Sequence, residues 1–494
     1  MEASEAIKRL PGVIEVAVVM ATEANKELLR SQGILTPEGD RAGPNDIVIA
    51  LKGVGLTEGV LRKAREVLFQ MKPRTARYAS IDDALHENPD IRMASISIPG
   101  QHVKDVAFKL LERGVNLFVF SDHVPIEVEV AMKREAAARN LLVMGPEAGT
   151  SIIGGVGFGF ANRVIRGPVG IVASSGSGIQ ELSVILHDMG VGISHAIGVG
   201  GRDMTRAVGG LMTRESLRLL DGDRSTKVIV LLAKQSDAEL VKRVLEDAKI
   251  GKPLLLCLLG HKEKISEHPQ LPTLHATALK ACSLVSPQAY SKALSALERE
   301  VTSLKEKVDG GGHPRGFYCG GTLATETAFL WSEAGIEVYS NLELPWTKKL
   351  DDPLRSRGAT VVDYGSEEFT AGRVHPIIDP SLRNRRITQE LASPETGSIA
   401  FDLIIGYGAP VDAVSRTLEE VGPALATGER KRVSARVVGT GEDPQWDQTR
   451  ELSKYPLITT GSNAVTAAFA AACAEEDASV LHHLIERFVL SEVT

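Results

Sequence analysis

The sequence predicts an α/β protein with several doubly wound parallel sheets and a small α/β module at its N-terminus. Short apolar runs alternate with amphipathic stretches of helical length through most of the 494 residues, as in strands that crossover helices connect. A pattern of strand, glycine turn and helix also occurs twice, with Gly176 and Gly321 at equivalent positions. Because 494 residues are too many for one core, we expect several domains.

The first expected domain is the small α/β module at residues 1–75. Residues 13–20 and 46–51 are apolar and rich in β-branched side chains, which predicts two strands. One helix is expected over 22–32 and another over 57–72, where apolar side chains recur on one helical face.

The second expected domain covers residues 76–165 and has a Rossmann-like alternation of strands and helices. This alternation predicts a parallel sheet whose loops at the carboxyl ends of the strands are the usual place for ligands. No G-x-G-x-x-G motif follows its first strand, so we do not expect a nicotinamide cofactor.

The two copies of the repeated pattern fall in two further expected domains, at residues 166–287 and 315–494. The segment between them, residues 288–314, is a charged helix that ends in three glycines, which predicts a helical linker. Further strands are expected in these two domains at 228–233, 253–259, 336–339, 359–363, 401–405, 433–438 and 456–460.

The composition excludes several functional classes. A net charge of -7 and a pI near 6.0 argue against a nucleic-acid partner, which normally needs a basic face. The four cysteines lie far apart without C-x-x-C spacing, so we expect buried thiols and no metal site. The N-terminal residues do not resemble a signal peptide, and no apolar run approaches the roughly 18 residues of a membrane span. A cytoplasmic location without a membrane partner is therefore expected.

The glycine turns of the repeated pattern are the candidate phosphate-binding residues. Free N–H groups and the dipole at a helix N-terminus attract anions, and hydroxyl groups in the turn add further donors. Two such turns in one chain suggest one site that both share. The alternative is that each turn only closes a βα unit. The candidates are Ser174, Ser175, Gly176, Ser177 and Gly178 in the first copy, and Gly320, Gly321 and Thr322 in the second.

A second candidate group, for binding substrate, is Gly200, Gly201, Arg202 and Asp203, which follows an apolar strand. Arg202 offers a guanidinium that binds a carboxylate or phosphate with two hydrogen bonds. The alternative is an ion pair between Arg202 and Asp203 on the surface.

The third candidate group is the proline-containing loop 373–383. Arg373, His375 and Arg383 are its candidate catalytic residues, because two fixed cations and one titratable ring suit an anionic substrate. The alternative is a helix N-terminus that Asp379 caps. Glu181 and Glu326 recur in both copies and receive no role, since a Glu in the second helical turn is often solvated.

Several motifs resemble known acyl-CoA ligases. MGPEAGT, GPVGIVASSGSGIQE and GVGISHAIGVGGRDM resemble the α-subunit of succinyl-CoA synthetases, and GFYCGGTLATETAF, VVDYGSEEF and IIGYGAP resemble the CoA-ligase domain of their β-subunits. Both sets in one chain, with GRVHPIIDPSLRNRR between the last two motifs, resemble the FdrA family. The resemblance covers nearly everything after residue 80, and the N-terminal VVMATEANKELL also looks FdrA-like.

The resemblance implies a CoA-binding-type domain over residues 80–160 and two flavodoxin-like ligase domains. It also implies that the helices after the glycine turns face a phosphoryl or acyl phosphate group. FdrA proteins are linked to carbamoyl transfer between oxamate and phosphate, in multi-subunit complexes for the breakdown of allantoin-type nitrogen compounds.

The chain departs from the ligase pattern at three points. No ATP-grasp segment precedes the second copy, so ATP-driven ligation by this chain alone is not expected. His275, in LPTLHATALKAC, matches the phosphohistidine position and is a further candidate catalytic residue. It lacks the flanking glycines, so an exposed helical residue that is not phosphorylated is the favoured expectation. The glycine fingerprint for CoA phosphates is also absent, which leaves CoA possible and the cofactor unassigned.

We therefore expect an FdrA-type subunit of a carbamoyltransferase complex that handles an acyl phosphate such as carbamoyl phosphate. Its partners would be a small anionic substrate and other subunits of a hetero-oligomer. The first alternative is an acyl-CoA synthetase of the succinyl-CoA ligase type with a separate ATP-grasp partner. The second alternative is a scaffold without catalytic activity.

Overall fold

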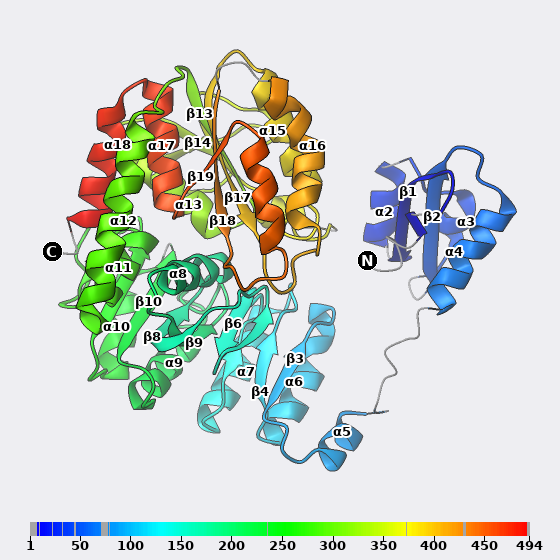
Figure 1. Cartoon of the computed structure of the whole chain (residues 1–494). Coiled ribbons are helices and arrows are strands. Elements are labelled where there is room, and N and C mark those ends of the chain that lie inside the picture. Colours follow the sequence, from blue (N-terminus) through cyan, green and yellow to red (C-terminus); the bar gives the residue numbers. More distant parts are fainter. Residues whose placement is uncertain are drawn as a thin grey trace. The chain divides into compact units, whose positions relative to one another are not determined.

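The computed structural model describes the chain except for residues 1–6, 9, 22, 32, 44–45, 71–77, 79, 235, 372, 428–430 and 492–494. It divides into two compact units (Figure 1). Unit 1 comprises Met1–Ile91 and Phe369–Val374, and unit 2 comprises Arg92–Glu368 and His375–Thr494.

Unit 1 contains the predicted small α/β module. Its strands β1 (Val13–Met20) and β2 (Ile47–Gly53) pair antiparallel. A small core of Leu29, Ile34 and Ala50 lies against them. The named helices of unit 1 before residue 91 are α2 (Glu23–Ser31), α3 (Pro37–Arg41), α4 (Glu58–Gln70) and, beyond the module, α5 (Ile81–Glu87).

Unit 2 begins with a three-stranded parallel sheet in the order β3-β4-β5. The crossover helices α6 and α7 connect its strands, as the alternating pattern predicts. The bounds are β3 (Met93–Ile96), η1 (Gly100–His102), α6 (Val103–Glu112), β4 (Asn116–Val119), α7 (Ile126–Ala138) and β5 (Val143–Met144).

The domain of the first glycine turn, which we call the first ligase domain after the resemblance described above, has a seven-stranded sheet in the order β12-β11-β10-β8-β9-β6-β7. The strands from β12 to β9 are parallel. Strand β6 pairs antiparallel with β9, and β7 pairs antiparallel with β6. The boundary expected at residue 165 therefore falls inside this sheet, because β6 and β7 precede that residue and Ile152 pairs with Ala196 of β9. The bounds are β6 (Thr150–Ile153), β7 (Val156–Gly159), β8 (Arg166–Ala173), α8 (Gly176–Asp188), β9 (Ile193–Gly198), α9 (Leu211–Gly222), β10 (Val228–Lys234), α10 (Ala238–Ala248), β11 (Leu254–Leu259), β12 (Gln270–Leu271) and α11 (Leu274–Val285).

The second ligase domain has a fully parallel seven-stranded sheet in the order β15-β14-β16-β13-β17-β18-β19. Strands β8 and β13 are central in their sheets, and each runs into a glycine turn and a helix, as the repeated pattern predicts. The bounds are β13 (His313–Tyr318), α13 (Gly321–Glu333), β14 (Val338–Ser340), β15 (Thr347–Lys349), β16 (Ala359–Asp363), α14 (Glu367–Thr370), α15 (Ser381–Ala392), β17 (Thr396–Ile404), α16 (Ala413–Thr427), β18 (Arg432–Val438), η2 (Trp446–Lys454), β19 (Leu457–Thr459), α17 (Asn463–Glu475), α18 (Ala478–Ile485) and η3 (Glu486–Leu490).

The two ligase domains share one hydrophobic core, to which α8, α11, α13 and α17 all contribute. Trp331 of α13 is fully buried and donates its indole N–H to the Ala467 carbonyl of α17 at 2.8 Å. Helix α12 (Pro287–Lys305) lies along α18 (Figure 1). It was expected to be a linker, but Leu297, Val301 and Leu304 place it in the same core.

No helix among the residues that the structure describes is both long and apolar enough to cross a lipid bilayer.

The packing of α12 predicts that Leu297→Ala destabilises unit 2 by about 2–5 kcal/mol, because Leu297 is 2% exposed and its removal leaves a cavity. Leu284→Ala in α11 is the matched control, since Leu284 is 48% exposed and its loss should be nearly neutral. Thermal unfolding of both variants measures the difference. Equal melting temperatures would show that α12 is a linker after all.

Candidate functional site

The two glycine turns lie in contact, so the helices α8 and α13 begin at one place. Ser175, the N-cap of α8, forms a hydrogen bond through its hydroxyl group with the hydroxyl group of Thr322 in the first turn of α13. The N–H of Thr322 also donates to Ser177 Oγ at 3.3 Å. We call this meeting point of the two N-termini the helix junction.

Three backbone donors at the helix junction are free. Among the described residues, no oxygen accepts from the N–H groups of Gly176, Ser177 and Gly321. The next N–H along α8, that of Gly178, is capped by Ser175 Oγ at 3.1 Å. Free N–H groups and two helix dipoles at one point suit a phosphate or carboxylate group.

Asp402 of β17 already occupies part of the second turn. Its carboxylate accepts from the N–H groups of Cys319 at 2.8 Å and Gly320 at 2.7 Å. Burial raises the pKa of Asp402, while the nearby Arg383 opposes that rise. Among the donors of this turn, Gly321 is therefore the one that stays open to a ligand. Ser174 directly follows β8, and its N–H donates to Leu232 O of β10 at 3.2 Å.

Arg383 does not point to a substrate, which corrects the sequence interpretation. Its side chain is 2% exposed and pairs with Asp402 at 3.3 Å. Its remaining donors bond to the Asn384 side chain and to Thr417 Oγ1. The reason is that Arg383 lies in α15, which packs on the sheet, so Arg383 supports Asp402 from behind.

The boundary between the two units falls within the loop 373–383. Arg373 is exposed and belongs to the segment Phe369–Val374 of unit 1. His375 belongs to unit 2, where its ring lies 5.5 Å from the Phe160 ring. Burial lowers the pKa of His375 to about 4, so its imidazole is neutral near pH 7.

The group at Gly200–Asp203 forms a buried ion-pair network rather than a surface pair. Asp203 is 0% exposed and accepts from Lys133 Nζ at 2.8 Å and from the N–H of Thr213 at 2.9 Å. Arg202 pairs with Glu129 at 2.9 Å instead of with Asp203. Gly200 packs closely, since a Cβ there would lie 2.4 Å from Pro146 O, while Gly201 is exposed. Because Arg202 and Asp203 pair with other side chains of the fold, few of their hydrogen-bonding groups are available to a substrate.

Sequence reasoning missed two charged residues at the helix junction, Lys234 and Asp363. Lys234 ends β10 and Asp363 ends β16, and both lie beside Gly321. Burial raises the pKa of Asp363 to about 6, while Lys234 lowers it. The available signal was a charged residue directly after a buried apolar strand, because the carboxyl ends of parallel strands are where ligands bind.

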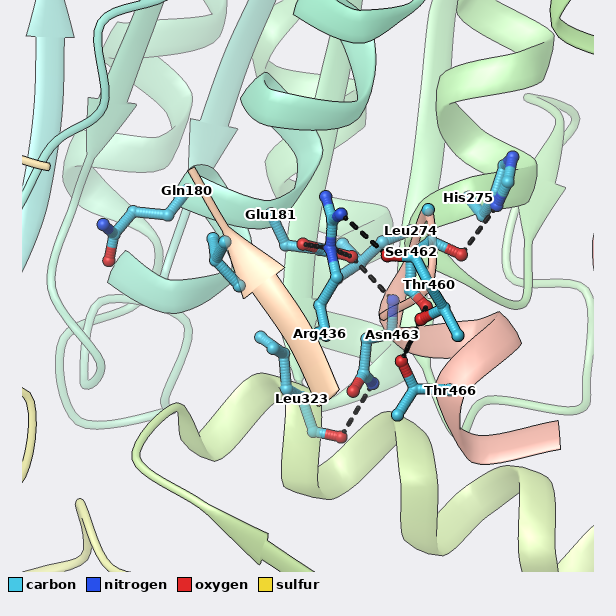
Figure 2. Close-up of polar contacts among 12 residues, drawn as sticks. Gln180, Glu181, Leu274, His275, Leu323, Arg436, Thr460, Ser462, Asn463 and Thr466 are labelled. Carbon is cyan, nitrogen blue, oxygen red and sulfur yellow. Dashed lines mark hydrogen bonds and ion pairs between the residues drawn. The ribbon is translucent and has the colours of Figure 1, made fainter. Parts of the chain in front are cut away.

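Glu181 and Glu326 each accept a hydrogen bond from a helix of the other ligase domain, and Figure 2 shows Glu181 beside Arg436. Glu181 of α8 accepts from the N–H of Asn463, the first residue of α17, at 2.8 Å. Glu326 of α13 accepts in the same way from the N–H of Leu274, the first residue of α11, at 2.8 Å. Each glutamate therefore caps a helix of the other domain, and both are 0% exposed. A Glu in the second helical turn is often solvated, but these two carboxyl groups are buried.

Asn463 and Arg436 join the two glutamates into one network. Arg436 Nε lies 2.8 Å from a Glu181 carboxylate oxygen (Figure 2). Asn463 Nδ2 donates to Glu326 at 2.8 Å. Burial raises the pKa of Glu326 to about 7, with help from the charge of Glu181. The network is thus a buried link between the domains that has little access to a ligand.

His275 is buried in this region and is not the exposed helical residue that was expected. It is 6% exposed, and its Nδ1 lies 2.7 Å from Ser462 Oγ, the N-cap of α17 (Figure 2). Burial, together with the positive charge of Arg436, lowers the pKa of His275 to about 3. The expectation failed because α11 packs against α17, a contact between segments far apart in the sequence.

Within the described part of the chain, no cluster of His, Cys, Asp or Glu is arranged to hold a metal ion. The helix junction presents groups that suit an anion, namely backbone N–H groups, three hydroxyl groups and the Lys234 ammonium group, with the buried carboxyl groups of Asp363 and Asp402 nearby.

Two family models match the chain. The model described as CoA-ligase matches residues 317–478, and the model described as "AllF, heavy metal-associated domain" matches residues 1–83. The segment 1–83 contains neither Cys nor His, the side chains that soft metal ions prefer.

YahF of Escherichia coli K12 is 36% identical to the chain over 468 residues, which are 92% of this chain and 91% of YahF. The α-subunit of the ADP-forming succinate–CoA ligase of Methanothermobacter thermautotrophicus is 28% identical over 166 residues, 33% of this chain and 55% of the subunit. Among solved structures, a dinucleotide-forming acetyl-coenzyme A synthetase of Candidatus Korarchaeum cryptofilum is 16% identical, with a TM-score of 0.31 over 84% of this chain and 86% of that chain.

The buried Glu326 predicts a specific pH dependence of stability. Its pKa is raised from 4.5 to about 7 in the folded protein, so the folded state holds more protons than the unfolded state between these pH values. The contribution of Glu326 to stability is therefore present below about pH 4.5 and is lost as the pH rises to about 7. Glu326→Gln removes this titration, so the melting temperature of the wild type should fall relative to that of the variant between pH 5 and pH 8.

The matched control is Glu298→Gln, on the exposed side of α12, which should keep the wild-type profile. A constant difference between wild type and Glu326→Gln over this pH range would contradict the assignment.

Proposed function

This chain belongs to the FdrA family, the acyl-CoA-ligase-like family of its relative YahF, and we propose that it is the acyl-transferring subunit of a carbamoyltransferase complex. Its substrate would be an acyl phosphate such as carbamoyl phosphate, bound at the helix junction. The reaction class would be carbamoyl transfer between a nitrogen acceptor of the oxamate type and phosphate, as the resemblance implies.

The observation that supports this proposal most is the set of free N–H groups of Gly176, Ser177 and Gly321 at the helix junction. Three donors and two helix dipoles match the charge and the three oxygens of a phosphoryl group. Catalysis would then depend on positioning and on stabilisation of charge, because no side chain in the junction is an evident nucleophile.

Two observations argue against a phosphohistidine step at His275. The ring is buried against Ser462, and its low pKa keeps it neutral. It also lies in the second position of the regular helix α11, which has no flexible glycines that would let the ring move between two sites. A transfer directly between acyl group and phosphate needs no such carrier.

An acyl-CoA synthetase with a separate ATP-grasp partner is the second candidate function. The match of residues 317–478 to the CoA-ligase model and the similarity to a succinate–CoA ligase subunit favour it. In that case the sheet β3-β4-β5 would hold CoA, although it has no glycine fingerprint for the CoA phosphates. Formation of acyl-CoA from ATP, carboxylate and CoA by the assembled complex would select this function over carbamoyl transfer.

The proposed phosphate site predicts the effect of removing one free donor. Gly176 is the first residue of α8, where helices accept proline, and Ser175 before it is extended, with φ -144 and ψ 125. A Cβ atom at Gly176 would lie 3.1 Å from Gly149 Cα, so proline and alanine both require a small shift of this neighbour. Gly176→Pro removes the N–H and should weaken phosphate binding by about tenfold, for a hydrogen bond to a charged group worth about 1.5 kcal/mol. Titration calorimetry with inorganic phosphate measures the affinity.

Gly176→Ala is the matched control, because it adds a side chain at the same position and keeps the N–H. It should bind phosphate within about twofold of the wild type, given the usual small effect of such changes. The same affinity in the proline and alanine variants, with the melting temperature unchanged, would place the phosphate elsewhere. The function itself is tested by co-purifying the native complex and assaying it for carbamoyl phosphate formed from phosphate and a carbamoyl donor.

A further inference from the structure

Lys234 and Asp363 lie beside Gly321, where α13 begins. A Cβ atom on Gly321 would lie 2.5 Å from Asp363 Oδ2 and 3.1 Å from Lys234 Nζ, so both charged groups face this one residue. Lys234 comes from the first ligase domain and Asp363 from the second. The junction of the two domains thus brings a cation and a carboxyl group to the free N–H of Gly321.

Both side chains have unused hydrogen-bonding capacity. Asp363 is 4% exposed, and the N–H of Gly365 donates to its Oδ1 at 2.8 Å. No donor among the described residues reaches Oδ2, and Lys234 Nζ has no hydrogen-bond or ion-pair partner there. Because buried polar groups in folded proteins are normally paired, an unpaired carboxyl oxygen in this position points to a ligand.

We infer that Lys234 and Asp363 are catalytic residues of the helix junction, where Lys234 binds the phosphate group and the Asp363 carboxyl group transfers the proton that acyl transfer needs. This inference rests on the proposed function. The other buried carboxylate and cation nearby cannot take over these roles. Asp402 already accepts from two N–H groups, and Arg383 pairs with Asp402.

In the proposed step, a carbamoyl group is transferred from nitrogen to phosphate. An oxygen of HPO₄²⁻ attacks the carbonyl carbon and forms the new C–O bond, while the C–N bond breaks and its electron pair goes to nitrogen. Protonated Asp363 donates its proton to that nitrogen, and the resulting carboxylate takes the remaining proton of the phosphate group. The carboxyl group is regenerated, and the reverse reaction uses the same groups.

The charged and titratable groups around Asp363 allow it to change protonation near neutral pH. Lys234 of β10 stabilises the carboxylate, whereas burial and Asp402 of β17 favour the neutral acid, and the pKa of Asp363 is raised to about 6. His375 lies beside Gly365, and its pKa of about 4 keeps it uncharged through the working range. Cys319 at the end of β13 also stays neutral, since burial raises its pKa.

The first test measures binding of inorganic phosphate to the full chain by titration calorimetry. Lys234→Ala should weaken binding by about tenfold or more, and Lys234→Arg should restore most of it, because a charge-assisted hydrogen bond is regained. Asp363→Asn should bind phosphate like the wild type at pH 5 but more tightly at pH 8, where the wild-type carboxylate repels the anion. Lys242→Ala, an exposed lysine of α10, is the matched control and should bind normally.

The second test measures steady-state kinetics of the assembled complex. Asp363→Asn should lower kcat by about a hundredfold, the usual size of general acid–base catalysis, without raising KM for phosphate. The wild-type rate should also fall as the pH rises above the pKa of Asp363, and the variant should lose this dependence. Asp412→Asn, an exposed aspartate before α16, is the matched control.

The outcomes separate this inference from the proposed function. An active complex in which Asp363→Asn keeps the wild-type kcat, or a phosphate affinity that Lys234→Ala leaves unchanged, overturns the inference alone. A complex without carbamoyl transfer, whose chain still binds phosphate through Lys234, overturns the proposed function and keeps the anion site. A wild-type chain that binds no phosphate overturns both.

Discussion

The crossed pairing of two buried glutamates is the constraint on which the rest of unit 2 depends. Glu181 and Glu326 each accept from the first N–H of a helix in the opposite ligase domain, and Asn463 contacts both. A buried carboxylate is costly unless its partners stay in place, so the pairing tolerates little rotation of one domain against the other. Because the glutamates lie in the second turns of α8 and α13, they also fix the distance between the N-termini of these helices.

The crossed glutamates and the helices that carry them are arranged symmetrically in the two copies, but the residues at the helix junction differ between the copies. The first copy contributes hydroxyl groups from Ser175 and Ser177 and the ammonium group of Lys234. The second copy contributes the carboxyl groups of Asp363 and Asp402. A symmetric junction would bind an anion in either orientation. Under the proposed function, this difference in charge would give a bound acyl phosphate one favoured orientation, with its phosphate toward the first copy and its acyl group toward the carboxyl side.

The sequence predicted the order of strands and helices and the pairing of the two glycine turns, because both follow from local patterns of apolar residues and glycines. It missed the roles of Glu181 and His275, since the partners that bury them lie far away in the chain, Asn463 being 282 positions from Glu181. The same reason explains α12, whose charged surface suggested a linker while its apolar stripe with Leu297 faces the core. Local patterns cannot show which distant helix covers a side chain.

The buried position of His275 has a consequence for how such a fold can move an acyl group. Thr273 and Ser462 are the N-caps of α11 and α17, so His275 occupies the place that Ala464 has in the other copy. At that place the ring supports the contact between the two helices and keeps a pKa too low for it to carry charge near neutral pH. Under the proposed function, a chain whose matching histidine serves as packing would hold both reactants at the junction at the same time. Direct transfer of that kind favours a rigid site with donors already in position, which is the arrangement that the crossed glutamates maintain.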